Sequence, residues 1–122
     1  MQYINGKVYE QFHNPGLNKA VYLVMVLVDT IVQIYSYVTG EKYQFFVTSV
    51  YRPDDPGYHG KWQACDGDIV GQDTDEWPTT LMVIVGPVLT VLRGFCSKIQ
   101  FQFHSSPKYH LHLEYDDSSI KK

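Results

Sequence analysis

The chain lacks several features that mark common classes of protein. Its ten Lys and Arg residues are outnumbered by thirteen Asp and Glu residues, for a net charge of −3, so it has no basic excess of the kind that a phosphate backbone requires. Its two cysteines, Cys65 and Cys96, show no CxxC spacing, which argues against a zinc knuckle or a dithiol redox motif. We therefore expect no nucleic-acid partner and two reduced, buried thiols, with a disulfide between them as the open alternative.

The chain also shows no targeting segment and no unbroken apolar run that could span a membrane. Residues 1–7 lack a basic region followed by an apolar core and a small-residue cleavage site. The most apolar stretch, Ala20 to Val38, is interrupted by Asp29 and Gln33, and no uncharged run reaches about 18 residues. We expect synthesis in a cytoplasm without a signal peptide, no membrane span, and a buried helix from Ala20 to Val38.

The length and composition of the chain favour a single globular domain that comprises residues 1–122, with its core from about residue 16 to 115. A chain of 122 residues can bury enough surface to fold without obligatory metals or disulfides. Hydrophobic residues make up 44% of it and aromatic residues 15%, including ten Tyr, which is typical of a packed core. Oligomeric state is left open by these numbers.

The first helix has recognisable ends. Asn18 is in position to cap its N-terminus, after Pro15 and Gly16, and Gly40 follows its last turn as a stop. Its apolar positions cover most of the circumference, which predicts a helix packed on several sides.

The middle of the chain alternates between strand and helix patterns. Residues 43–51 are rich in aromatic and β-branched side chains and predict a strand, and residues 64–70 predict a second, short strand. Turn residues at 54–58 predict a surface loop that leads into His59. A helix is expected from about Thr79 to Arg93, with Gly86 and Pro87 kinking or splitting it.

Two C-terminal segments show strict alternation of apolar and polar residues. Residues 98–104 and 109–115 therefore predict half-buried strands, and Pro107 between them favours a hairpin loop. If the strands pair, their polar faces coincide. The side chains on that shared face are Gln100, Gln102, His104, His110, His112 and Glu114.

The expected fold class is therefore α+β, with a small antiparallel sheet packed against helices. A catalytic zinc site needs three His or carboxylate ligands and an open position for water, and His59, Asp66 and His112 satisfy that count. In a His-x-His strand both rings point the same way, so His112 can ligate while His110 stays within reach of substrate or water.

Each of these residues also has an ordinary structural interpretation. His59 followed by Gly60 is typical of a surface loop, and Asp66 followed by Gly67 is typical of a turn. Arg52 before Pro53 reads as a solvated charge at a strand end. A metal-free α+β domain with surface histidines is the structural alternative to a metal site, and it requires the combined spacing to be accidental.

The spacing resembles that of the zinc D-alanyl-D-alanine carboxypeptidase and D,D-dipeptidase superfamily. This superfamily has a hedgehog-like fold and includes phage endolysin L-alanyl-D-glutamate peptidases. Its pattern runs Ser-Gly-Tyr-Arg, then Ser-x-His-x-x-Gly-x-Ala-x-Asp, then a late His that is often within His-x-His. The matching segments here are Ser49-Val50-Tyr51-Arg52, then His59, Ala64 and Asp66 at the family spacing, and His110-Leu111-His112.

The resemblance implies a zinc ion held by His59, Asp66 and His112. It also implies that Arg52 binds the substrate carbonyl or carboxylate, a role that suits its fork of donors. Two departures concern the loop near the metal, where Gly57 replaces the family Ser and Trp62 replaces the family Gly.

A further departure concerns the general base. Many members carry a Glu three or six residues before the last ligand, whereas Tyr109 and Ser106 stand there in this chain. We expect His110 to accept the proton of the attacking water, with His104 as the second candidate. Glu114 lies one strand pitch beyond the ligand, roughly 7 Å by strand rise, so we do not expect it to reach that water.

The function implied by the resemblance is zinc-dependent hydrolysis of peptidoglycan stem peptides, of the carboxypeptidase or endolysin type. The implied partner is a peptidoglycan peptide, reached by release to the cell wall as for phage enzymes. The missing Glu favours the alternative, a zinc-binding structural or interaction module of the same fold with little or no turnover. Bond specificity, D,D or L,D, stays open.

Overall fold

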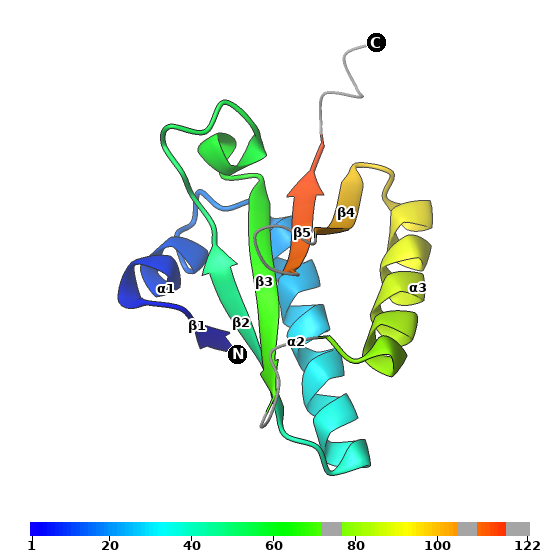
Figure 1. Cartoon of the computed structure of the whole chain (residues 1–122). Coiled ribbons are helices and arrows are strands. Elements are labelled where there is room, and N and C mark those ends of the chain that lie inside the picture. The colour runs from blue at the N-terminus through cyan, green and yellow to red at the C-terminus, as the bar shows by residue number, and fades with distance from the viewer. Residues whose placement is uncertain (72–76, 105–109, 117–122) are drawn as a thin grey trace.

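The chain forms an α+β structure in which helices cover one face of a five-stranded sheet (Figure 1). The computed structural model describes residues 1–71, 77–104 and 110–116. The strand order is β1-β2-β3-β5-β4. The strands are β1 (Gln2–Tyr3), β2 (Tyr43–Ser49), β3 (Ala64–Gly71), β4 (Ile99–His104) and β5 (His110–Tyr115).

The sheet is mixed, which corrects the expectation of an antiparallel one. β2, β3, β5 and β4 pair in antiparallel fashion, but β1 pairs with β2 in parallel. β1 has only two residues, Gln2 opposite Phe46 and Tyr3 opposite Val47, and two residues are too few to show a period in a sequence. The expected strand over residues 43–51 ends earlier, at Ser49, which pairs with Asp66 after a shift of register between Val47 and Ser49, as occurs at a β-bulge.

The first long helix, α2 (Lys19–Thr39), has the ends expected from the sequence. The Asn18 side chain accepts from the backbone N–H groups of Ala20 and Val21, and Gly40 ends the helix in the left-handed conformation at φ 74°. Asp29 is buried in its middle, bonded to Gln33 and 3.5 Å from the Met1 amine. The predicted caps at both ends of this helix are therefore confirmed.

The expectation that α2 is packed on several sides is wrong. Its inner face is fully buried against the sheet, whereas Leu23, Ile34 and Tyr37 on the other side are 63%, 58% and 89% exposed. Within the described residues, α2 is the one helix that is long and apolar enough to cross a membrane, a test that core helices of soluble proteins also pass. Composition alone therefore did not reveal which faces of α2 are covered.

The second long helix, α3 (Thr79–Phe95), is a single helix through Pro87. Of the two expected outcomes, a kink or a split, the split does not occur. Pro87 lies on the exposed side, where the backbone carbonyl that loses its N–H partner can be hydrated. Leu81, Val85 and Leu89 are fully buried on both sides of the proline, and this packing holds the helix in one piece.

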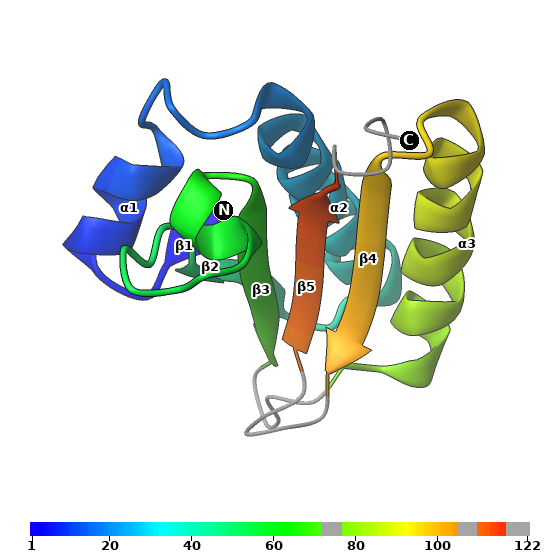
Figure 2. The same cartoon turned by 90° about the horizontal axis from the view of Figure 1, so that it is seen from above.

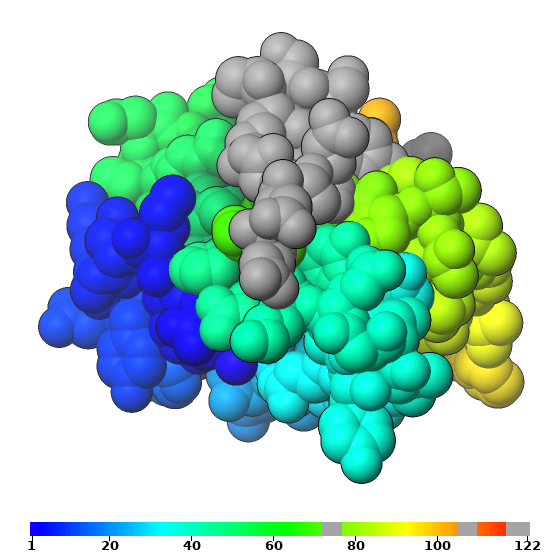
Figure 3. Space-filling view, turned by 60° about the horizontal axis from the view of Figure 1, so that its bottom comes forward, coloured from blue at the N-terminus to red at the C-terminus, as the bar shows by residue number. Residues whose placement is uncertain are grey.

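The layers are clear when the molecule is seen from above (Figure 2). α2 and α3 lie on one face of the sheet, and the helical turn η1 (Tyr58–Lys61) lies over the other. The short helix α1 (Gly6–Phe12), capped by Asn5, flanks β1 and β2. Figure 3 shows α1 and α3 on opposite sides of the molecule, with the C-terminal end of α2 between them.

The core fills the space between the sheet and the two long helices. Its largest fully buried side chains include Phe12, Phe45, Met25, Ile69, Leu81, Leu89, Leu111 and Leu113. Alternation along β5 sends Leu111 and Leu113 into this core and sends His110, His112 and Glu114 to the opposite face, as the sequence predicted. The expected hairpin loop and the positions of Ser106 and Tyr109 lie outside the described residues.

Candidate metal centre

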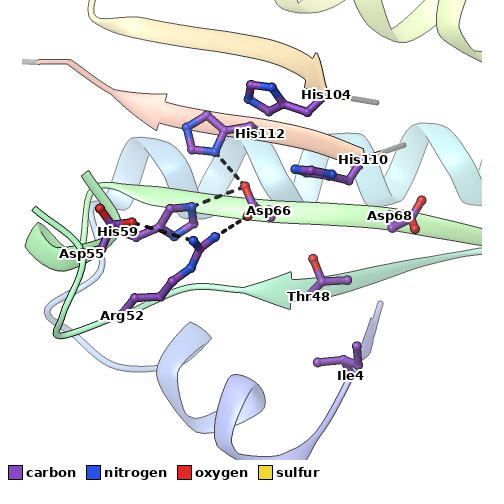
Figure 4. Close-up of a pocket in the computed structure, with 10 residues that line it drawn as sticks. All are labelled: Ile4, Thr48, Arg52, Asp55, His59, Asp66, Asp68, His104, His110 and His112. Atoms are coloured by element: carbon purple, nitrogen blue, oxygen red, sulfur yellow. Dashed lines mark hydrogen bonds and ion pairs between the residues drawn. The ribbon is translucent and has the colours of Figure 1, made fainter. Parts of the chain in front are cut away.

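Three side chains from separate elements converge on the open face of the sheet. His59 comes from η1, Asp66 from β3 and His112 from β5, where Asp66 and His112 are direct partners in the strand register. Their ligand atoms all lie within 4.8 Å of one another, which makes this a group that can hold a metal ion. Figure 4 shows the three side chains pointing toward one another, with the Arg52 guanidinium beside His59 and also pointing toward Asp66.

His59 is 4% exposed, and a backbone carbonyl group fixes the orientation of its ring. Its Nδ1 lies 2.7 Å from the Val50 carbonyl oxygen, and because a carbonyl only accepts, Nδ1 carries a hydrogen, which makes Nε2 the nitrogen that can bind a cation. Among the described residues Nε2 has no hydrogen-bond partner, although it lies 3.3 Å from Asp66 Oδ1. A buried imidazole nitrogen that faces a carboxylate oxygen needs a cation between them, either a proton or a metal ion, so the donor set fits a metal ion.

Asp66 uses its two oxygens for different partners. Oδ1 accepts from His112 Nδ1 at 2.7 Å, and Oδ2 accepts from the Arg52 guanidinium at 2.8 Å. Burial by itself raises the pKa of the Asp66 carboxyl, but hydrogen bonds and charge from His112 and His59 outweigh burial and hold that pKa far below its usual range. The carboxylate is therefore ionised at neutral pH and offers Oδ1 as a ligand.

His112 lies between two carboxylates. Its Nδ1 bonds Asp66 Oδ1 at 2.7 Å and its Nε2 bonds Glu114 Oε1 at 2.8 Å. Burial lowers the pKa of this imidazole, but hydrogen bonds to Asp66 and Glu114 and the charges of both acids outweigh it, so the pKa is raised. Without a metal, the protonated ring supplies the positive charge between the two acids.

Arg52 lies at the rim, half exposed, and is bonded to the same carboxylate that offers a ligand atom. Its Nε donates to Ser49 Oγ at 2.9 Å, and its other nitrogens pair with Asp66 Oδ2 and, at 3.8 Å, with Asp55. The β-bulge between Val47 and Ser49 comes directly before the segment that carries both Arg52 and the Val50 carbonyl. Residues directly after this bend therefore contact both ligands, the Val50 carbonyl contacting His59 and the Arg52 side chain contacting Asp66.

The two further histidines lie beside the ligand group on β4 and β5. His104 is opposite His110 in the strand register, and their ring centroids are 5.3 Å apart. The His104 ring is also 5.4 Å from the His112 ring. All three expected ligands and the three residues predicted to act on substrate, Arg52, His104 and His110, therefore line one cavity.

That cavity has a volume of about 770 Å³ and opens over the sheet face. Sequence reasoning missed four of its lining residues. Asp68 follows Asp66 by one strand period, a signal that was available, whereas nothing in the sequence placed the residue after β1 or the end of β2 at the site. The four missed residues are Ile4, Thr48, Asp55 and Asp68.

The arrangement combines imidazole nitrogens and a carboxylate oxygen, a donor set that suits divalent transition metals. It brings a positively charged Arg52 and two more imidazoles to the wall of the same cavity, so a bound molecule can be polarised and protons can be exchanged beside the ion.

No family model matches the chain, and no curated protein or solved structure matches it either. Functional inference therefore depends on the site itself and on the motif spacing.

Proposed function

We propose that this chain is a zinc-dependent peptidase that hydrolyses peptidoglycan stem peptides. The observation that carries the proposal is the convergence of His59 Nε2, Asp66 Oδ1 and His112 Nδ1 at the wall of an open 770 Å³ cavity. Three ligands of His and carboxylate type, with space beside them, are the protein contribution to catalytic zinc sites. The resemblance of the surrounding motifs to the D,D-carboxypeptidase superfamily supports zinc as the ion and a peptide as the substrate.

The roles of the other residues follow from their positions. Zinc, when bound, supplies Lewis acidity and makes hydroxide available near neutral pH. Arg52 lies half exposed at the rim, where its unshared donors can orient a substrate carbonyl or carboxylate. His110 accepts the proton of the attacking water. His104, whose ring centroid lies 5.3 Å from that of His110 and 5.4 Å from that of His112, is the second candidate for this role.

The proposal includes where the protein acts. The chain is made in a cytoplasm and is released to the cell wall, as phage endolysins are, and α2 serves as a core helix and not as a membrane span. A mature extracellular form with a cleaved N-terminus would count against this route.

Measurement of metal content and cleavage on the same samples tests the proposal. Metal-free protein is titrated with zinc and then incubated with muropeptides, whose products are identified by mass spectrometry. We expect one zinc per chain, loss of zinc in His112→Ala and Asp66→Asn, and cleavage of stem peptides. His13→Ala is the matched control, because His13 is exposed at the C-terminal end of α1 and does not line the cavity.

His110→Ala separates binding from catalysis. If His110 is the base, this variant keeps its zinc and loses cleavage by about 10²- to 10⁴-fold. Absence of zinc from the wild-type protein would overturn the proposal as a whole.

A second candidate function is a zinc-binding module without turnover. It is favoured by the missing general base, because Tyr109 and Ser106 stand where the family carries its Glu. Glu114 does not replace that Glu, since it is bonded to the far nitrogen of His112. Stoichiometric zinc with no cleavage of any muropeptide would support this candidate over the peptidase.

A further inference from the structure

Glu114 holds the nitrogen of His112 that faces away from the other two ligands. The Glu114 Oε1 to His112 Nε2 distance is 2.8 Å, while Nδ1 of the same ring faces Asp66 Oδ1 at 2.7 Å. We propose that Glu114 is a positioning residue that selects Nδ1 of His112 as the metal ligand. This inference rests on the zinc site proposed above and assigns a residue that the motif spacing does not include.

The selection follows from the chemistry of the two groups. A neutral imidazole has one N–H and one lone pair, and an ionised carboxylate can only accept. In the metal-free protein both nitrogens of the protonated ring face carboxylates. When a metal ion replaces the proton on Nδ1, the hydrogen bond to Glu114 keeps the other hydrogen on Nε2, and the lone pair of Nδ1 points toward Asp66 and His59. Metal-bound histidines commonly donate their other N–H to a carboxylate or carbonyl in this way, and such partners fix the tautomer and raise ligand basicity.

The strand geometry makes the contact a fixed one. His112 and Glu114 are two residues apart on β5 and project from the same face. Their side chains are only 18% and 21% exposed, so water competes weakly for the bond. Glu114 is opposite Ala64 on β3 and Gln100 on β4, so it lies within the sheet and not at its edge.

His59 shows the same device with the nitrogens reversed. The Val50 carbonyl holds its Nδ1 at 2.7 Å and leaves Nε2 for the metal, whereas Glu114 holds Nε2 of His112 and leaves Nδ1. The two histidines therefore ligate through different atoms. Because Glu114 lies on the opposite side of the His112 ring from the ligand group, it orients a ligand and is not the general base.

Zinc affinity of three variants tests this role. Competition with a chromophoric chelator is measured on metal-free wild-type protein, Glu114→Ala, Glu114→Gln and Glu10→Gln. We expect Glu114→Ala to bind zinc about 10- to 100-fold more weakly and Glu114→Gln to lose less, because its amide oxygen still accepts from Nε2. Glu10→Gln removes the same charge from an exposed position on α1 and should match the wild type.

A nitrogen-resolved NMR measurement distinguishes positioning from a general loss of stability. In zinc-loaded wild-type protein with labelled histidines, we expect a metal-ligated Nδ1 and a protonated Nε2 at His112. In Glu114→Ala we expect signals from both tautomers. Ligation through Nε2 in the wild type would overturn the inference even if the variants fail to fold, and so would wild-type affinity in folded Glu114→Ala. Wild-type protein that binds no zinc would instead overturn the proposed function itself.

Discussion

The two cysteines have different surroundings, although neither takes part in a disulfide. Cys65 is fully buried in β3 next to Asp66, and burial, with the Asp66 charge, raises the pKa of its thiol far above the usual range. Cys96 is only half-buried at the end of α3. The expectation of two reduced thiols agrees with the structure, but the expectation that both are buried holds for Cys65 alone.

Thiol reactivity should follow this difference. We expect one thiol per chain, that of Cys96, to react with Ellman's reagent in the folded protein, because only a thiolate with access to the reagent reacts. The second thiol should react only in denaturant. Cys96→Ser should remove the first reaction and leave the second, and rapid reaction of both thiols in native protein would contradict the burial of Cys65.

Gly67 is a residue at which an added side-chain atom would contact buried core side chains. A Cβ at this position would collide with the Phe45 ring and lie 3.1 Å from Met25 Cε, and both of these side chains are almost fully buried. We expect Gly67→Ala to lower the free energy of unfolding by about 1–3 kcal/mol, measured by urea denaturation. Gly94→Ala, at an open position of α3, is the control and should leave stability unchanged or raise it by up to about 1 kcal/mol.

At the scale of elements, the turn η1 is joined closely to the loop that follows β2. The Arg52 N–H donates to the His59 carbonyl at 3.3 Å, and a Cβ on Gly60 would collide with the Asp55 backbone carbonyl. This close approach keeps His59 and Arg52 on the same side of Asp66. Turn residues in the sequence indicated a loop here, but not that it packs against the turn carrying a ligand.

Separating these two elements should weaken the site. In Gly60→Ala the loop must move, since the obstructing atom is backbone and cannot rotate away. We expect zinc affinity to fall at least tenfold, an effect of the size seen when outer partners of a metal ligand are lost, with the far-UV circular dichroism spectrum unchanged. Wild-type affinity in this variant would show that the loop does not position the ligands.

At the scale of the whole molecule, the charges of the metal-free site make stability depend on pH. Asp66 has a lowered pKa in the folded state, so its contribution is present above its unfolded pKa of about 3.9 and is lost as pH falls toward the folded value. His112 has a raised pKa, so its contribution is present below about pH 6.5 and is lost as pH rises through the folded value. The two contributions overlap between these limits.

We therefore expect metal-free protein in chelator to be most stable between about pH 4 and 6.5, as measured by urea denaturation across pH 3 to 9. His112→Ala should flatten the alkaline side of the curve. A wild-type curve that rises steadily from pH 6 to 9 in chelator would contradict the charged arrangement of His112 between Asp66 and Glu114.

Zinc should reverse this trend. Metal binding needs a deprotonated imidazole, so the stabilisation by zinc grows with pH as that of the proton declines. At a free zinc concentration 1,000 times the dissociation constant, we expect about 4 kcal/mol of added stability. The thermal unfolding midpoint with and without zinc at pH 6 and pH 8 measures this, and equal zinc shifts at both pH values would argue against His112 as a ligand.

Local patterns in the sequence were sufficient to predict which face of the sheet carries the site. The period of two along residues 110–115 places His110, His112 and Glu114 together because strand side chains alternate whatever the partner strand is. Asn18 and Gly40 marked the ends of α2 because capping depends on backbone groups within a few residues. The expected ligand set, His59, Asp66 and His112, came from spacing that resembles a known family.

Only the tertiary structure decided how that site is held. The Val50 carbonyl on His59, the Glu114 carboxylate on His112 and the Arg52 guanidinium on Asp66 are contacts whose geometry depends on the packed sheet, the bulge and η1. The parallel pairing of β1 and the unbroken helix through Pro87 also depend on packing against distant residues. Periodicity specifies which way a side chain points, but hydrogen-bond partners and covered faces are set by contacts between segments far apart in the chain.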